Sequence, residues 1–484
     1  MPLLGSRGAA SLTGFGALAN LGYFLRNSLR FRGSNNAYLS RTPASAGTGT
    51  GKTWTWSGWV KRGTIGSSDL ISLMYGATSG GASDRGGFGF YTYSGGGTGS
   101  DSLTLYYNAN FANNLTTTQV FRDPSAWYHI IYAVDTTQAT ASNRVKLYVN
   151  GVQVTAFSAS NYPTQNYQFA IGNNVAQWIS SEAGTQRFFD GYLAELNFID
   201  GQALTPSSFG KTDPVTGQWV PKKFGGAYGT NGFYLKFDDS SAVGKDSSGN
   251  GNNWSTSGHS VTPGATYDLM TDVPTLTNAT TANYCVINTT TTQPTGWQVA
   301  SAFSNGGLTS TIASAASDGP AYGTIALPRS GKWYWEVIIT NSTVPGAVGI
   351  SESSMARPDS TGPICRMLYS GGGTGASFAY NGFTNAGSYT FFGNATLGIA
   401  CDMDNGAIYF AVNGTYVNSG VPTSGASKTG AIFTDLLSAS PGGGSWLPMS
   451  FGYNGHVHNH NYGQRPFAYS APSGYKTLNT FNLP

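Results

Sequence analysis

Apolar and polar residues alternate with a period of two along much of the chain, and in two places the alternation runs into Asn-Gly. Val145–Val154 reads VKLYVNGVQV and Ala407–Val417 reads AIYFAVNGTYV. Alternation of this kind is typical of a β-strand with one buried face. Asn-Gly tolerates the positive φ angles of a two-residue hairpin. The pattern therefore predicts two similar β-hairpins, far apart in the sequence.

A pair of tryptophans precedes each predicted hairpin. Trp54 and Trp56 belong to one pair, and Trp333 and Trp335 to the other. Because strand side chains alternate between faces, each pair lies on one face of its strand. The repeat of tryptophan pair and hairpin predicts two β-sandwiches in series.

The spacing of the strands and turns predicts an all-β protein of two jelly-roll-like sandwich domains with a short N-terminal anchor. No window has the 3.6-residue period of a long amphipathic helix. The predicted parts are an anchor or arm at 1–30, a first sandwich at 31–209, a connector at 210–296, a second sandwich at 297–467 and a C-terminal tail at 468–484.

Composition supports a folded β-protein. Of 484 residues, 10% are charged, 67 are glycine and 13% are aromatic. Low charge alone would also fit a low-complexity chain, but the aromatic residues supply the apolar core that disordered chains lack. Three cysteines are too few for a disulfide framework.

Charge is unevenly distributed along the sequence. Residues 1–68 contain eight Lys and Arg and no acid, so with a net charge of +3 the remainder carries −5. This asymmetry predicts an acidic docking surface or partner for the N-terminal end. The alternative is that these are scattered surface charges. The basic residues do not cluster with stacking aromatics, so nucleic-acid binding is not expected. No signal peptide and no membrane insertion are predicted.

The first sandwich resembles the concanavalin-like, laminin-G-type lectin fold. The resemblance rests on WYHIIYAVD, VKLYVNGVQV and FFDGYLAELNFIDGQAL, and the matching residues are Trp127, His129, Tyr148, Asn150 and Gly151. The second sandwich resembles a SPRY domain at GKWYWEVIITNS, VGIS, LGIACDMDNGAIYFAVNGT and WLPMSFG. Neither family is catalytic in general.

The two domains in this order, with the segments GAASLTGFGA and NYGQRPFAYSAPSGYKTLNTFNLP, look like virion proteins of tailed bacteriophages. The resemblance implies a virion protein that is assembled in the host cytoplasm and held to other virion proteins by its N-terminal segment. The residues expected to anchor it are Arg7, Phe15, Arg26 and Arg30.

The first functional hypothesis is a tail fibre or receptor-binding adhesin that recognises host-surface glycans or proteins, many weak sites on one particle giving avidity. The alternative is a purely structural virion component, such as a head decoration, head fibre or tail-knob protein. A homo-oligomer, as a trimer, is expected for a fibre, although the chain has no coiled-coil heptads or β-helix repeat.

Catalysis is not expected. A glycoside hydrolase needs two facing carboxylates, and the four glutamates, Glu182, Glu195, Glu336 and Glu352, do not alternate on one strand. Asp402 and Asp404 do alternate, but they stand at a turn, where Asp is favoured for turn geometry. A glycan hydrolase is therefore the third hypothesis, and no cofactor is expected.

Metal binding has two candidate sets. His456, His458 and His460 alternate, so on a strand they share a face, about 7 Å apart. Copies of them could meet on the axis of a trimer and bind a transition-metal ion; the alternative is a polar strand packed against a neighbour. For calcium, the candidates are the loop residues Asp190, Asp200, Asp246 and Asn250.

Glycan binding requires aromatic faces with amide or carboxylate groups beside them. The candidates in the first sandwich are Tyr91, Tyr93, Tyr106, Trp178 and Asn108. The alternative is that exposed tyrosines cover a subunit interface.

Overall fold

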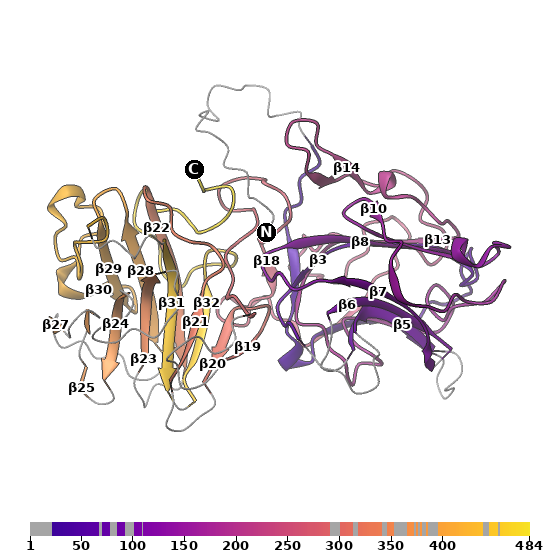
Figure 1. Cartoon of the computed structure of the whole chain (residues 1–484), viewed down its shortest axis with the longest axis horizontal. Coiled ribbons are helices and arrows are strands. Elements are labelled where there is room, and N and C mark those ends of the chain that lie inside the picture. Colours follow the sequence, from indigo (N-terminus) through magenta and orange to yellow (C-terminus); the bar gives the residue numbers. More distant parts are fainter. Residues whose placement is uncertain are drawn as a thin grey trace. The chain divides into compact units, whose positions relative to one another are not determined.

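The two groups of strands form two separate units in the computed structural model (Figure 1). The N-terminal unit comprises Leu25–Thr275 together with Phe303–Leu308, and the C-terminal unit contains Leu276–Ala302 and Thr309–Pro484. The structure describes residues 22–66, 70–77, 85–91, 101–108, 110–290, 301–312, 318–340, 346–352, 365–371, 374–375, 378–379, 384–385, 395–438, 445–453 and 455–484.

Short and medium strands joined by turns make up the N-terminal unit. They are β1 (Ser28–Phe31), β2 (Tyr38–Arg41), β3 (Thr53–Arg62), β4 (Ile71–Ala77), β5 (Arg85–Phe90), β6 (Ser102–Tyr107), β7 (Asn110–Val120), β8 (Trp127–Asp135), β9 (Val145–Val149), β10 (Val152–Gln153), β11 (Phe157–Ser160), β12 (Ala176–Ile179), β13 (Gly191–Asp200), β14 (Gly210–Thr212), β15 (Trp219–Pro221), β16 (Phe233–Leu235), β17 (Ser255–Ser257) and β18 (Leu269–Met270), with 3-10 turns η3 (Gly33–Asn35), η4 (Ala141–Asn143) and η5 (Pro206–Ser208).

Most of these strands form two antiparallel sheets with a shared core, whereas β14 and β15 pair with each other as a separate two-stranded sheet. Sheet A has the order β10-β9-β8-β3-β13-β1-β18, with β16 also paired to β13, and sheet B has the order β11-β7-β6-β5-β4-β12-β2-β17. Both Trp54 and Trp56 are fully buried in the core, where they contact Phe88 of sheet B. The tryptophan pair therefore lies on one strand face, as the period-two pattern predicts.

The C-terminal unit is a second pair of sheets. One runs in the order β20-β32-β22-β28-β29-β30 and the other β21-β31-β23-β24-β25. The strands of this part of the chain are β19 (Ala302–Ser304), β20 (Thr309–Thr311), β21 (Asp318–Tyr322), β22 (Lys332–Thr340), β23 (Gly346–Glu352), β24 (Cys365–Gly371), β25 (Thr374–Gly375), β26 (Phe378–Ala379), β27 (Thr384–Asn385), β28 (Ala395–Asp402), β29 (Ala407–Val412), β30 (Thr415–Tyr416), β31 (Trp446–Tyr453) and β32 (Val457–Asn461), with η6 (Val417–Ser419) and η7 (Gly425–Ser427).

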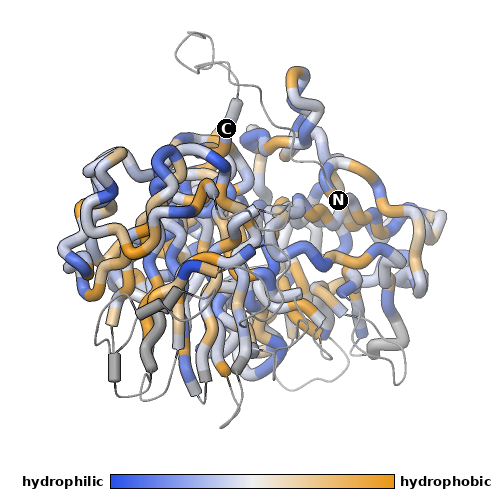
Figure 2. The backbone as a smooth tube through the Cα atoms, turned by 60° about the vertical axis from the view of Figure 1, so that its left-hand side comes forward, coloured by the Kyte–Doolittle hydropathy of each residue, from blue (hydrophilic) through white to orange (hydrophobic). Residues whose placement is uncertain are grey.

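Both predicted Asn-Gly hairpins are confirmed. Asn150 and Gly151 have φ angles of 48° and 83°, and Asn413 and Gly414 have φ angles of 48° and 81°. Two successive positive φ values match the right-handed twist of the strands that the turn joins. Apolar and polar residues are interspersed along the strands (Figure 2), and no helix among the described residues is long and apolar enough to cross a membrane.

The predicted domain limits differ from the observed units. Most of the expected connector belongs to the N-terminal unit, because β16 joins sheet A and β17 joins sheet B. The expected tail is part of the C-terminal unit: Lys476 forms a parallel bridge with Trp333, and Leu478 is fully buried. These segments are short and irregular, so their membership depends on contacts that a local pattern does not show.

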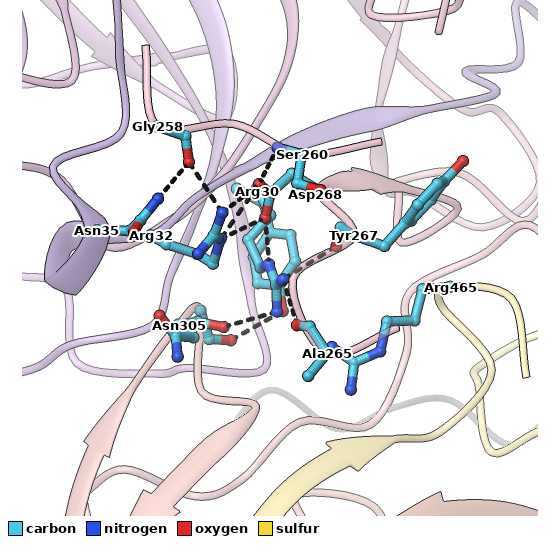
Figure 3. A network of polar contacts seen from close by, with 12 residues as sticks. Arg30, Arg32, Asn35, Gly258, Ser260, Ala265, Tyr267, Asp268, Asn305 and Arg465 are labelled. Atoms are coloured by element: carbon cyan, nitrogen blue, oxygen red, sulfur yellow. Dashed lines mark hydrogen bonds and ion pairs between the residues drawn. The ribbon is translucent and has the colours of Figure 1, made fainter. Parts of the chain in front are cut away.

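Basic residues near the N-terminus find their acidic partners within the same unit. The Nε atoms of Arg30 and Arg32 lie 3.0 and 2.9 Å from Oδ1 of Asp268 (Figure 3). Lys61 is 2.7 Å from Asp272. All these carboxylates are at least 200 residues away in sequence. An external acidic partner is therefore not needed to explain these three charges.

The predicted anchoring residues differ in their exposure to solvent. Arg30 lies in β1 and is fully buried against Asp268, so in the folded unit it is not accessible to another protein. This corrects its assignment to the anchor. Arg26 is exposed and stays a prediction, whereas Arg7 and Phe15 lie outside the described residues.

Candidate functional site

The outer face of sheet B carries a continuous row of side chains across six strands. Strand register places Ser40, Trp178, Tyr75, Gly87, Tyr106 and Asn114 opposite one another in that order. The neighbouring row points into the core and contains Leu39, Ile179, Met74, Phe88, Leu105 and Leu115. The first row is therefore on the opposite face, away from the core.

Aromatic side chains gather in this outer row. The rings of Tyr75 and Trp178 lie 5.8 Å apart between centroids. Tyr75 and Tyr106 form a cluster with Leu70, against which Tyr91 and Trp178 pack as partly buried residues. Trp178 and Tyr91 thus present part of their surface to the exterior, which is the geometry of an apolar platform for a ligand.

Gly87 makes room for the two tyrosine rings. A Cβ atom at this position would lie 3.2 Å from Cδ2 of Tyr75 and 3.4 Å from the hydroxyl oxygen of Tyr106. It would also come within 2.7 Å of the carbonyl oxygen of Met74. A larger residue here would displace the rings, so the glycine shapes the platform.

Glu182 supplies a carboxylate beside the aromatic rings. The residue follows β12, in a tight loop where Ala183 and Gly184 have positive φ angles. The Glu182 carboxylate accepts hydrogen bonds from the Tyr106 hydroxyl, at 3.3 Å, and from Arg187. Burial raises the pKa of Tyr75 to about 12, and the negative charge of Glu182 contributes to the rise. Tyr75 therefore stays protonated at neutral pH.

Arg85 adds an accessible cation at the same place. Its side chain is 40% exposed, and its Nη1 atom lies 3.9 Å from Oε1 of Glu182. The site thus combines aromatic faces, a carboxylate and guanidinium donors. Sugars expose apolar C–H faces and hydroxyl groups, which such groups contact and hydrogen-bond.

The residues predicted to bind a glycan are only partly brought together. Tyr91, Tyr106 and Trp178 share the cluster. Tyr106 is only 1% exposed, so its hydroxyl group bonds to Glu182 and its ring is not open to a ligand. Asn108 is exposed at the turn after β6, and Tyr93 lies outside the described residues. Their role as a binding site stays a prediction.

Sequence reasoning missed the residues that complete the cluster. Tyr75, Glu182, Arg85 and Arg187 were not predicted as site residues. The alternation around Tyr75 in ISLMYGA is a signal that could have placed it on the outer face. Glu182 lies in an irregular loop, and nothing local indicates where its side chain lies.

His129 is the center of a buried polar contact on sheet A. The Trp219 Nε1–H donates to His129 Nδ1 at 2.8 Å, and Nε2 lies 2.8 Å from the Ser57 hydroxyl. Because Nδ1 accepts, the neutral ring carries its proton on Nε2. Burial lowers the pKa of His129 to about 3. The Ser57–His129 contact is thus a buried structural pair, with tryptophan where a catalytic triad has a carboxylate.

The first Asn-Gly hairpin contacts the strand and the indole ring around His129. The Asn150 side-chain oxygen accepts from the His129 backbone N–H at 2.8 Å, which ties the hairpin turn to strand β8. Gly151 faces Trp219: an added Cβ would lie 2.6 Å from the indole ring. The residues that carried the lectin-like resemblance therefore act here as fold determinants.

The three alternating histidines lie inside the C-terminal unit, which contradicts a metal site on a trimer axis. His456, His458 and His460 are at most 1% exposed. His456 Nδ1 lies 3.0 Å from His458 Nε2, and His460 Nε2 lies 3.0 Å from the Ser450 hydroxyl. Rings buried by their own chain cannot meet copies from other subunits. Among the described residues, no group of three or more His, Cys, Asp or Glu is arranged to hold a metal ion.

The calcium candidates bind backbone donors. Asp190 accepts N–H bonds from Gly33, Asn305 and Gly306. Carboxylates surrounded by N–H groups are poorly arranged for a cation, which needs oxygen ligands.

Asp200 and Asp246 have the same character. Asp200 accepts N–H bonds from residues 48, 49 and 231, and Asp246 from residues 234, 248 and 252. Asn250 donates its side-chain amide to the carbonyls of Gly229 and Gly232. These loop residues therefore hold the turns around them.

The acidic pair before the second hairpin has the turn role that its position predicts. Asp402 Oδ1 accepts from the backbone N–H groups of Asp404 and Asn405, both at 3.1 Å. Asp404 accepts from the Gly331 N–H at 2.7 Å. Both carboxylates therefore stabilise the connections at this end of the sheet.

Together the fold and these contacts define a protein of two β-sandwich domains of binding type in series. Residues 33–209 match the family model of the concanavalin A-like lectin/glucanases superfamily, and residues 332–435 match that of the SPRY domain. The chain thus contains a concanavalin-like domain followed by a SPRY domain, types compatible with a protein that is not an enzyme. No curated protein matches the chain.

Solved structures with related folds have low similarity to this chain. The SPRY domain of human HERC1 is 18% identical, with a TM-score of 0.24, over 32% of this chain and 87% of that one. A SAP-like pentraxin from Limulus polyphemus is 16% identical, with a TM-score of 0.29, over 42% and 94%. A putative carbohydrate binding protein from Bacteroides ovatus is 16% identical, with a TM-score of 0.30, over 48% and 58%. None is similar enough to indicate a ligand.

Proposed function

We propose that this protein is a glycan-binding adhesin whose N-terminal unit holds its ligand on the outer face of sheet B. The observation that carries the proposal is the row of Trp178, Tyr75 and Tyr106, with the carboxylate of Glu182 beside it. A sugar ring would stack on the exposed part of Trp178. Its hydroxyl groups would bond to the exposed guanidinium of Arg85, and the buried carboxylate of Glu182 would hold the charged groups of the site in place.

The setting that we propose is the surface of a tailed bacteriophage virion, where the protein acts as a tail fibre or other receptor-binding protein. The support is the resemblance of GAASLTGFGA and of the C-terminal segment to virion proteins, together with the two binding-type domains. Many copies on one particle would convert weak glycan contacts into firm attachment by avidity. Attachment to other virion proteins through the N-terminal segment and assembly as a homo-oligomer are parts of this proposal.

A glycan array with the full-length protein tests the binding function, followed by affinity measurement on the glycans that bind. Trp178→Ala should weaken binding about tenfold or more, because a stacked aromatic side chain is a typical hot spot. Glu182→Gln keeps the shape of the side chain and removes its charge, so it tests the polar half of the site. Tyr469→Ala, which removes a partly exposed ring of the C-terminal unit, is the matched control.

Two results would contradict the proposal. Equal affinity of the wild-type protein and both site variants would show that the glycan does not bind on the outer face of sheet B. Binding to no glycan, with the protein located by cryo-electron microscopy among shell or tube proteins and its loops buried, would favour the structural virion role instead.

A further inference from the structure

We propose a second ligand site in the N-terminal unit, a pocket on the outer face of sheet A that binds a single sugar ring bearing a carboxylate. The pocket has a volume of about 260 Å³ and lies over strands β8 and β9, between residues 135–143 and 203–205. This volume is below the roughly 300–1,000 Å³ of pockets for drug-sized ligands, so it suits one ring. The inference rests on the carbohydrate binding proposed above, but on different residues.

One wall of the pocket is fixed to the sheet by Thr55. Its hydroxyl donates to the carbonyl oxygen of Gln202 at 2.7 Å and accepts from the backbone N–H of Leu204 at 2.8 Å. These two bonds hold the chain at Ala203–Thr205 in place. The Leu204 side chain thus gives the pocket an apolar surface that is already positioned before a ligand arrives.

The part of the lining at residues 135–143 is organised by Asp135 and by Arg144, which follows it in sequence. Asp135 accepts bonds from the backbone N–H and hydroxyl of Thr137, at 3.1 and 2.6 Å, and from Gln138 Nε2 at 2.6 Å. Arg144 donates to the carbonyl oxygens of Gln138, Ala139 and Pro163 at 2.8–2.9 Å. Partial burial raises the pKa of Asp135, but these hydrogen bonds outweigh it and hold the pKa below its usual value. The carboxylate is therefore ionised at neutral pH.

The floor presents one cation to the ligand. Lys146 stands opposite Ala133 on the neighbouring strand, and this small residue leaves space beside it. Within the described part of the chain, Lys146 forms no ion pair, and both it and Asp135 line the pocket. Lysine is a compact point charge that binds carboxylates. Lys146 is thus the lining group that would bind an anionic group of the ligand.

The remaining groups suit the rest of a sugar ring. The ring of Tyr148 and the side chain of Leu204 offer apolar contact, and Asp135 and Asn143 offer hydrogen-bonding groups. A sugar ring with a carboxylate for Lys146 and hydroxyl groups for Asp135 and Asn143 matches this set of side chains. The chemical class is therefore a hexuronic acid, either free or at the end of an acidic polysaccharide.

Titration of the full-length protein with glucuronate, followed by saturation-transfer NMR, tests the site. Glucuronate should bind more tightly than glucose, which lacks the carboxylate, and than acetate, which lacks the ring. Lys146→Ala should weaken glucuronate binding about 10- to 100-fold, the loss expected for a charged hydrogen bond. Lys211→Ala, an exposed lysine outside the pocket, should leave it unchanged.

The outcomes separate this inference from the proposed function. Equal binding of glucuronate by the wild-type protein and Lys146→Ala, or acetate binding as well as glucuronate, overturns the second site. Loss of glucuronate binding in Trp178→Ala but not in Lys146→Ala places the uronate on sheet B, which overturns this proposal and leaves the first standing. Retention in Trp178→Ala with loss in Lys146→Ala supports it.

Discussion

Replacing Asp268 by alanine should strongly destabilise the N-terminal unit. Asp268 is fully buried and accepts bonds from Arg30 Nε at 3.0 Å, from Arg32 Nε at 2.9 Å and from the Ser260 backbone N–H at 2.8 Å. The variant would leave two buried guanidinium groups without their counter-ion. Breaking a buried pair in this way costs about 3–5 kcal/mol, a large part of the roughly 5–15 kcal/mol by which domains are stable.

Native-state hydrogen exchange on the full-length protein measures this loss. Amides in β1 and β13 exchange through opening of the N-terminal unit, so their protection reports its free energy of unfolding. The matched control is Asp239→Ala, which removes an exposed pair with Lys245 and should leave protection unchanged. A loss below about 1 kcal/mol in Asp268→Ala, in the range of a surface ion pair, would refute the reasoning, because it would mean that Arg30 and Arg32 find solvent or other acceptors.

Three further predictions follow from buried polar groups. Burial lowers the pKa of His460 to about 3. Between pH 6.5 and pH 3 the unfolded chain therefore binds a proton at this residue that the folded chain does not. Between pH 7 and pH 5, urea unfolding should show that the stability of the wild-type protein falls by about 2 kcal/mol more than that of His460→Gln. Trp219→Phe leaves His129 Nδ1 without its donor and should cost about 1–3 kcal/mol, with a changed Nδ1 chemical shift in NMR; an unaltered shift would contradict the tautomer. Asp246→Ala removes the acceptor of three bonds within its loop and of one from Tyr234 in β16, so limited proteolysis should cut near residue 250 faster than in wild type. Equal rates would show that the loop holds without Asp246.

Tertiary contacts added most to the sequence-based picture where charge was concerned. The acid-free N-terminal stretch predicted an acidic docking surface or partner, and Lys61 and Arg30 pair with Asp272 and Asp268 of the same unit. These carboxylates are distant in sequence, and only the addition of β18 beside β1 brings them close. The histidine alternation was similarly a correct strand pattern, but it did not reveal that both faces of β32 are covered.

The candidate site shows the same division. Its rings, Trp178 and Tyr106, could be found because each strand alternates, which fixes which side chains share a face. Their neighbourhood depends on the order β2-β12-β4-β5-β6-β7, in which β12 stands between β2 and β4. A strand order of that kind is set by long-range pairing. Glu182 joins the site only through the loop that follows β12.

The fold class of this protein follows from local signals: alternating strands, Asn-Gly hairpins and tryptophan pairs each depend on backbone geometry over a few residues. These signals predict two β-sandwiches in series. The folded chain was needed to show which charges are neutralised inside the fold, where the domains end, and which polar groups converge beside aromatic rings. Those properties depend on pairing between segments that are hundreds of residues apart, and the free energy of that pairing is not a sum of local preferences.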